Sequence, residues 1–157
     1  MRCALNEKNA IEWTLHFDGA CHGNGTATAK AGYGWLIQSE PGVVVASGYG
    51  SVAAKAGEDP VTNNVAEWMA VIEGLHWLAC CNIASPDVLN IYGDSALVVN
   101  QFNGAWKCKQ DRMKELCRRG MSIADNLRRR GIQVDAAWIP REQNTDADAL
   151  STKGVHQ

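Results

Sequence analysis

The stretch Ile11–Gly25, IEWTLHFDGACHGNG, decides how the first part of the chain folds. Its apolar and polar side chains alternate up to Phe17, which predicts a strand with one face on a core. Asp18 follows at the expected end of this strand, in phase with the polar side chains, and Gly19 comes next. A carboxylate before a glycine-containing loop suits a metal or phosphate site, but it equally suits a simple turn.

Composition indicates one globular domain over residues 1–157, with 1–10 as a loose leader and 152–157 as a tail. The net charge is −2, which argues against a generally basic nucleic-acid binder. The charge is unevenly spread, because residues 107–130 hold nine Lys or Arg against three acids, a local +6 that leaves −8 elsewhere. This distribution fits metal bound at one place and phosphates at another, although a solvated helix face would also explain it.

The six cysteines contain no C-x-x-C pair, and they are Cys3, Cys21, Cys80, Cys81, Cys108 and Cys117. We expect reduced thiols that do not bind metal, in a cytoplasmic protein. Neither a signal peptide nor a membrane-spanning segment is evident, so no membrane association is expected.

Hydrophobic periodicity predicts the remaining elements. A hairpin is expected from strands 31–38 and 43–50, then a helix over 62–81 and a buried strand over 88–92. Helices over 95–102 and 111–130 follow, then a strand over 132–139 in which Trp138 continues the buried alternation, and a final helix over 144–151. A helix between two such strands predicts a parallel crossover, which places functional groups at the carboxyl ends of strands.

Four carboxylates fall on separate predicted elements: Asp18, Glu67, Asp94 and Asp148. Glu67 lies off the buried stripe of its helix, where an acid near the helix N-terminus has an ordinary explanation in the helix dipole. Convergence of all four would hold two Mg²⁺ ions about 4 Å apart, an arrangement that serves phosphoryl transfer.

The chain closely resembles type 1 ribonuclease H, in the family's order from about residue 13 to 151. Five segments carry the resemblance: FDGACHGN (17–24), AGYGW (31–35), TNNVAEWMAVIEGL (62–75), IYGDSALVVNQ (91–101) and WIPREQNTDADALS (138–151). The resemblance implies an α/β ribonuclease H-like fold, a five-stranded mixed sheet of order 3-2-1-4-5 flanked by helices.

It also implies endonucleolytic cleavage of the RNA strand of RNA–DNA hybrids by two metal ions, leaving 5′-phosphate and 3′-hydroxyl ends. Asp18, Glu67, Asp94 and Asp148 would be the catalytic metal ligands, with Mg²⁺ as cofactor and Mn²⁺ as a substitute. Asp148 is chosen over Asp146 by its register with Asn144 and the ADALS segment.

Substrate contacts are implied for seven residues. Asn24, Asn63 and Asn64 match minor-groove and sugar contacts, and Thr62 matches a pocket for a DNA phosphate, although caps and turns also explain these residue types. The short segment 104–110 offers Trp106, Lys107 and Lys109 to the DNA strand.

Two departures from many bacterial members point to the compact archaeal-like branch. The segment Pro140–Asn144, PREQN, lacks the histidine of the family's flexible loop, for which Arg141, Glu142 or Gln143 are possible substitutes. The basic protrusion is short, and His22 is the one histidine that merits a test.

The main prediction is therefore a monomeric nuclease acting on RNA–DNA hybrids. The alternatives are the same chemistry extended to double-stranded RNA and a non-catalytic nucleic-acid-binding module. Four clustered carboxylates argue against the binding module, because they repel phosphate unless metal is bound.

Overall fold

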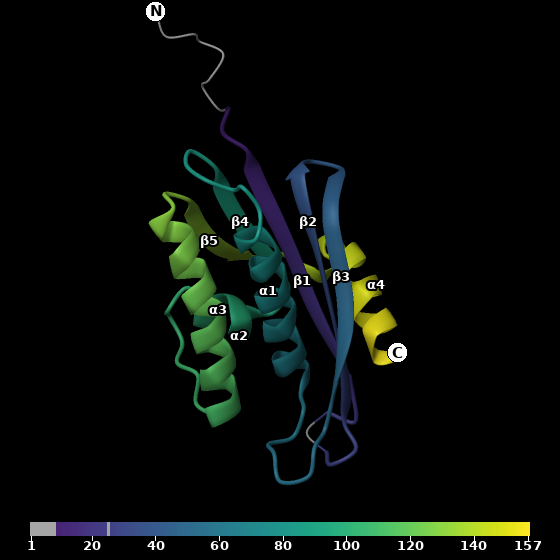
Figure 1. Ribbon diagram of the computed structural model, residues 1–157. Helices are drawn as coiled ribbons and strands as arrows, with labels where there is room; N and C mark the ends of the chain where they lie inside the picture. Colours follow the sequence, from purple (N-terminus) through teal and green to yellow (C-terminus); the bar gives the residue numbers. More distant parts are fainter. Residues whose placement is uncertain (1–8, 25) are drawn as a thin grey trace, which may run out of the picture.

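The chain forms a mixed five-stranded sheet with helices on both faces (Figure 1). The structure is a computed structural model and describes residues 9–24 and 26–157. The strands are β1 (Glu12–His22), β2 (Lys30–Glu40), β3 (Val43–Ala53), β4 (Val88–Gly93) and β5 (Gln133–Trp138). Their order is β3-β2-β1-β4-β5, with β1, β2 and β3 antiparallel and β4 parallel to both β1 and β5. The predicted fold and strand order are confirmed.

Four α-helices surround the sheet: α1 (Asn63–Ala79), α2 (Ala96–Phe102), α3 (Asp111–Arg129) and α4 (Thr145–Val155). Helix α1 packs on one face, between the sheet and α3, and α4 covers the other face (Figure 1). Two glycines allow this close packing. A Cβ on Gly19 would lie 2.7 Å from the backbone nitrogen of Glu67 in α1, and one on Gly34 would lie 2.4 Å from the Cβ of Leu150 in α4.

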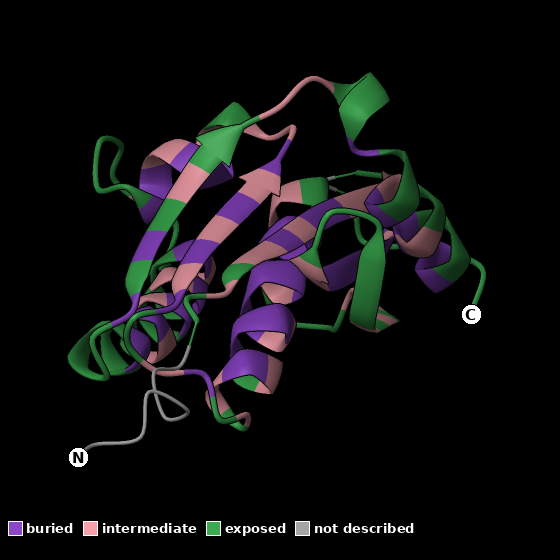
Figure 2. Ribbon diagram, turned by 90° about the horizontal axis from the view of Figure 1, so that it is seen from above, coloured by how far each residue is buried: buried purple, intermediate pink, exposed green. Residues whose placement is uncertain are grey.

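The main core lies between the sheet and α1, where the helix is buried along most of its length (Figure 2). Leu15 and Phe17 of β1 are fully buried there, as the alternation in the sequence predicts. Burying one such side chain contributes about 1.5–3 kcal/mol. The indole Nε1 of Trp68, also in this core, donates a 2.8 Å hydrogen bond to the Gln101 side chain and so ties α1 to α2.

The sequence predicted that the first strand ends at Asp18, but β1 continues to His22. Its antiparallel partner β2 accompanies it to the pair of His22 with Lys30, whereas its parallel partner β4 ends earlier, at the pair of His16 with Tyr92. Asp18 is therefore at the end of the parallel pairing but in the middle of its own strand. The sequence pattern located the end of the pairing between β1 and β4. It could not distinguish that point from the end of β1 itself.

Three further predictions change at the chain ends and edges. Helix α4 continues to Val155, so residues 152–155, predicted as tail, are helical. Most of the predicted leader, residues 1–8, lies outside the described residues. Trp138, predicted to continue the buried alternation of β5, is 55% exposed, because it stands at the end of an edge strand.

Two findings concern the chain as a whole. None of the helices in the described part is both long and apolar enough to cross a membrane. The five cysteines among the described residues form no disulfide, and Cys3 lies outside them.

Candidate metal-dependent nuclease site

Three of the four predicted acids converge on one point. Asp18 from β1, Glu67 from α1 and Asp94 from the end of β4 each present a carboxylate oxygen, and these oxygens all lie within 4.8 Å of one another. Asp18 and Glu67 are each only 5% exposed. Buried carboxylates are rare unless they are paired or bind a cation, so a solvated surface cluster does not explain this arrangement.

The sheet and α1 bring these acids together. Asp94 follows β4, which ends beside Asp18 because the parallel pairing stops at the pair of His16 with Tyr92. Gly19 lets the first turns of α1 approach β1, and this places Glu67 against the same point. Glu67 is therefore buried and faces the other acids. Its position off the apolar stripe of the helix was also compatible with an exposed side chain.

Asp148 reaches the cluster from α4, on the opposite face of the sheet. Its side chain hydrogen-bonds to Asp18 and lines the same cavity of about 470 Å³. It is more open than Asp18 and Glu67, and its Oδ1 lies 3.7 Å from Nη2 of Arg141. Asp146 lines a different cavity beside His16. The choice of Asp148 over Asp146 thus agrees with the geometry.

Burial in the cluster raises the pKa of two of the acids. Burial raises the pKa of Asp18 to about 8, and the charge of Asp94 and the hydrogen bond with Asp148 act in the same direction. Burial likewise raises the pKa of Glu67 to about 8, which a hydrogen bond from Ser95 partly offsets. Both carboxylates are therefore costly to ionise without a compensating positive charge.

A divalent cation fits this set of donors. Hard cations prefer carboxylate oxygens, and three are gathered here while Asp148 lines the same cavity. The Oε2 atom of Glu67 is buried and has no hydrogen-bond partner among the described residues. A cation would satisfy this oxygen and supply the positive charge that the buried carboxylates lack.

The predicted substrate contacts divide between two cavities. Asn24 and Asn63 line the acidic cavity, and Oδ1 of Asn24 accepts a 3.1 Å hydrogen bond from the backbone nitrogen of Asn63. Thr62 and Asn64 line a neighbouring cavity. Thr62 is also the N-cap of α1, because its hydroxyl accepts a hydrogen bond from Val65 at 3.4 Å.

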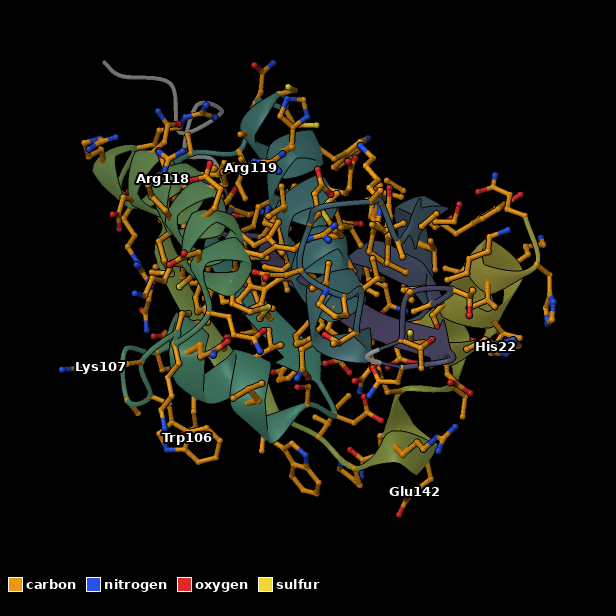
Figure 3. All side chains as sticks on the ribbon, turned by 90° about the horizontal axis from the view of Figure 1, so that it is seen from below. His22, Trp106, Lys107, Arg118, Arg119 and Glu142 are labelled. Carbon is orange, nitrogen blue, oxygen red and sulfur yellow. The ribbon has the colours of Figure 1, made fainter. Side chains whose placement is uncertain are left out.

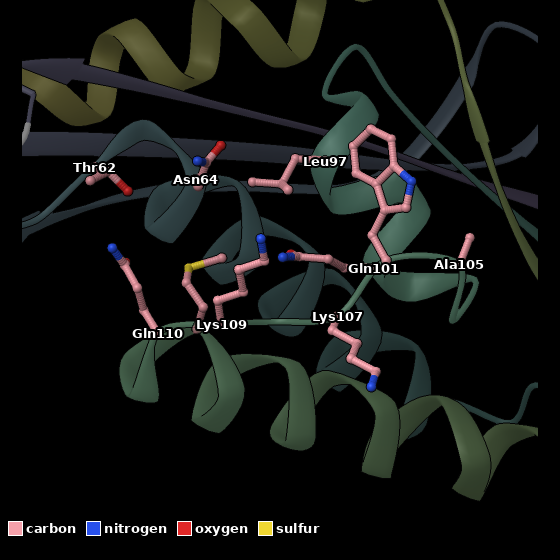
Figure 4. Close-up of a pocket in the computed structure, with 10 residues that line it drawn as sticks. Thr62, Asn64, Leu97, Gln101, Ala105, Lys107, Lys109 and Gln110 are labelled. Carbon is pink, nitrogen blue, oxygen red and sulfur yellow. The ribbon is translucent and has the colours of Figure 1, made fainter.

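The second cavity has a volume of about 680 Å³ and lies between α1, α2 and the start of α3 (Figure 4). Trp106, Lys107 and Lys109, from the connection between α2 and α3, line it together with Gln101 and Met113. Trp106 is 49% exposed and projects outward with Lys107 (Figure 3). An apolar floor with a flat ring and two amines beside it suits a nucleic-acid backbone and its sugars.

Of the three residues offered in place of the family's histidine, Arg141 reaches the acidic cavity. The segment Arg141–Gln143 forms a short 3-10 helix, and Arg141 lines the cavity while Glu142 projects away from the molecule (Figure 3). Gln143 lines the cavity around His16 instead. His22 lies at the end of β1 with its ring 5.6 Å from that of His156.

Sequence reasoning missed four residues that hold the acids in place. Ser95 hydrogen-bonds to Glu67 and caps α2, and Oγ of Ser151 lies 3.2 Å from Oδ2 of Asp18. Nε1 of Trp138 donates to the backbone oxygen of Asp94 at 3.1 Å. Asn144 donates to both β1 and Asp94. The only available signal was that Ser95 and Ser151 stand one and three residues from an acid.

Comparison with known proteins agrees with this site. The sequence profile of the Reverse transcriptase-like family matches residues 16–154. The chain is 31% identical over 156 residues to a ribonuclease H of Cupriavidus metallidurans, covering 92% of this chain and 95% of that one. It is 33% identical over 141 residues to a bifunctional protein of Mycobacterium tuberculosis, covering 90% of this chain. The chain spans 35% of the length of that mycobacterial protein.

Solved structures show the same fold. RNase H1 from the halophilic archaeon Halobacterium salinarum superimposes with a TM-score of 0.76 at 28% identity, over 92% of this chain and 98% of that one. LC11-RNase H1, solved in complex with an RNA/DNA hybrid, gives 0.75 at 25% identity, over 92% and 97%. The fold and the acidic cluster define a ribonuclease H-like domain. By its matching profile and its relatives, the chain belongs to the ribonuclease H family.

Proposed function

We propose that this protein is a ribonuclease H that hydrolyses the RNA strand of RNA–DNA hybrids with two divalent cations. The observation that carries the proposal is the convergence of carboxylate oxygens from Asp18, Glu67 and Asp94 within 4.8 Å, with Asp148 on the same cavity. Relatives of similar length named ribonuclease H, and a related enzyme solved with a hybrid, support it.

Mg²⁺, or Mn²⁺ in its place, bound by these four acids supplies Lewis acidity to the scissile phosphate and to the attacking water. The water forms a new bond to phosphorus while the bond from phosphorus to the 3′-oxygen breaks. One water proton finally resides on that 3′-oxygen, and the products carry 5′-phosphate and 3′-hydroxyl ends. The carboxylates would hold the metal ions at the reacting centre, and Arg141, which lines the same cavity, would contact a phosphate oxygen.

The two cavities divide the hybrid between them. Asn24 and Asn63, next to the acids, contact the RNA strand near the ribose 2′-hydroxyl, which distinguishes RNA from DNA. The DNA strand lies over the second cavity, where Thr62 and Asn64 meet a phosphate and sugar, and Trp106, Lys107 and Lys109 contact the backbone.

The test is cleavage of one labelled RNA strand, paired with DNA or with RNA, in Mg²⁺ and in Mn²⁺. Cutting in the hybrid alone supports a strict ribonuclease H. Cutting in both duplexes extends the substrate to double-stranded RNA, and binding without cutting in any condition would refute the enzyme in favour of a binding module. End analysis with a phosphatase and a 3′-end ligation reaction checks the predicted product ends.

A further inference from the structure

Asn144 links the three segments that carry Asp18, Asp94 and Asp148. Its side-chain nitrogen Nδ2 donates to the backbone oxygen of Phe17 at 2.9 Å and to Oδ1 of Asp94 at 3.4 Å. Its backbone oxygen accepts from the nitrogen of Asp148 at 3.1 Å. One residue thus contacts the strand position next to Asp18, the carboxylate of Asp94 and the turn of helix that carries Asp148.

The side chain has no helix-capping role. Asn144 stands at the N-cap of α4, where asparagine ordinarily accepts a hydrogen bond from the first turn of the helix. Here the side chain makes no capping bond. Because the Phe17 carbonyl can only accept, it fixes the orientation of the amide and directs Nδ2 toward β1 and Asp94.

The Asn144 amide is buried at a cost to the stability of the fold, which indicates a role other than stability. Asn144 is 2% exposed, and its Oδ1 atom is buried without a hydrogen-bond partner among the described residues. Phe17 lies one residue beyond the last pair of β1 with β4, so the amide fills the place where the two strands separate. A buried amide with an unsatisfied oxygen is a poor choice for stability alone.

We propose that Asn144 is a positioning residue for the metal-binding acids: its amide holds Oδ1 of Asp94 and the strand beside Asp18 at a fixed separation, and its backbone fixes Asp148. A hydrogen bond to one carboxylate oxygen orients the other, as partners of metal ligands generally do. The inference rests on the proposed metal-dependent function.

The test compares Asn144→Ser and Asn144→Ala by titration calorimetry with Mn²⁺ in the absence of substrate. Both variants remove the amide, but serine is a good N-cap and alanine a poor one. We expect both to bind Mn²⁺ about 10- to 100-fold more weakly than the wild type. In hybrid cleavage we expect kcat to fall while KM for the hybrid changes less than about twofold, because the substrate contacts remain.

Asn103→Ser is the matched control. Nδ2 of Asn103 also donates 2.9 Å across to a strand carbonyl, that of Ala136, but does not contact the acids. Its Mn²⁺ affinity should match that of the wild type. The inference is overturned if both Asn144 variants bind Mn²⁺ normally, if serine binds normally and alanine does not, or if both variants unfold in metal-free buffer. A wild type that binds Mn²⁺ but cuts no hybrid would refute the proposed function alone, whereas one that binds no Mn²⁺ would refute both.

Discussion

The two neighbouring cavities are built in opposite ways. The acidic cavity draws its carboxylates from β1, α1, α4 and the end of β4, and its central side chains are buried with raised pKa values. The second cavity takes Trp106, Lys107 and Lys109 from a single connection, and its tryptophan is half exposed. The carboxylates of the first come from four separate elements, whereas the ring and both amines of the second come from one short segment beside α1, α2 and α3.

This difference indicates what each cavity tolerates. The core fixes the geometry of a site assembled from four elements. When one acid is changed, the other side chains cannot move to replace it, so function is lost. Contacts presented from one connection are individually weak and act mainly through charge. Perturbing the first cavity should therefore affect chemistry, and perturbing the second should affect binding.

The largest effect is expected from Asp94→Asn, because it removes a carboxylate from the centre of the cluster. Cleavage of the hybrid should fall by about a thousandfold or more, corresponding to about 4 kcal/mol of lost transition-state stabilisation. Single-turnover cleavage in saturating Mg²⁺ measures it. Asp146→Asn is the matched control, since Asp146 lines the cavity around His16. Equal loss in both variants would contradict the assignment of the acids.

The second effect concerns binding. Lys107→Ala with Lys109→Ala should weaken hybrid binding by about tenfold at low salt, because two contacts with phosphates are lost. The slope of log affinity against log salt concentration should also become shallower, by about 0.9 for each lost contact. Affinity measured over a salt series in buffer without divalent cations, where the proposed function predicts no cleavage, is the test. Arg118→Ala with Arg119→Ala removes equal charge from α3, and an identical change there would mean that only overall charge matters.

The third effect is on stability and follows from the raised pKa values. In metal-free buffer Asp18 and Glu67 bind more protons in the folded protein than in the unfolded chain between about pH 4 and 8, so their contribution to stability should fall as pH rises through that window. Asp18→Asn should remove part of this loss and raise Tm at pH 8 by a few degrees, since 1 kcal/mol corresponds to about 2–4 °C. At pH 4 the variant and the wild type should melt together. Equal Tm values for Asp18→Asn and the wild type at pH 8 without metal would contradict the raised pKa of Asp18.

The smallest effect is expected from His22→Ala. This histidine is exposed at the end of β1 and packs edge-on against His156. Hybrid cleavage should stay within about twofold of the wild type, as for surface positions generally. A loss of tenfold or more, together with a changed pH profile, would show that His22 replaces the missing loop histidine and would extend the acidic cavity toward the end of β1.

Periodicity predicted most of the secondary structure because alternation in strands and the stripe of α1 follow from local burial. It failed where contacts between distant parts of the chain decide where an element ends or whether a side chain is buried. Strand β1 continues past Asp18 because β2 accompanies it, and α4 continues to Val155, whose backbone nitrogen would lie 2.2 Å from a Cβ on Gly32 of β2. Trp138 looked like a core residue but stands exposed over the Asp94 backbone.

The resemblance read from the sequence predicted the strand order, which the structure confirms. It also predicted the four acids as metal ligands, because the residues that match the family's motifs can be identified along the chain without knowing the fold. The tertiary structure alone decided that Glu67 is buried against Asp18, that the substrate residues divide between two cavities, and that Asn144 joins β1, Asp94 and α4. These are relations between residues as many as 127 positions apart, as for Asn144 and Phe17. Only the packing of the helices on the two faces of the sheet sets the separations and the burial on which the chemistry depends.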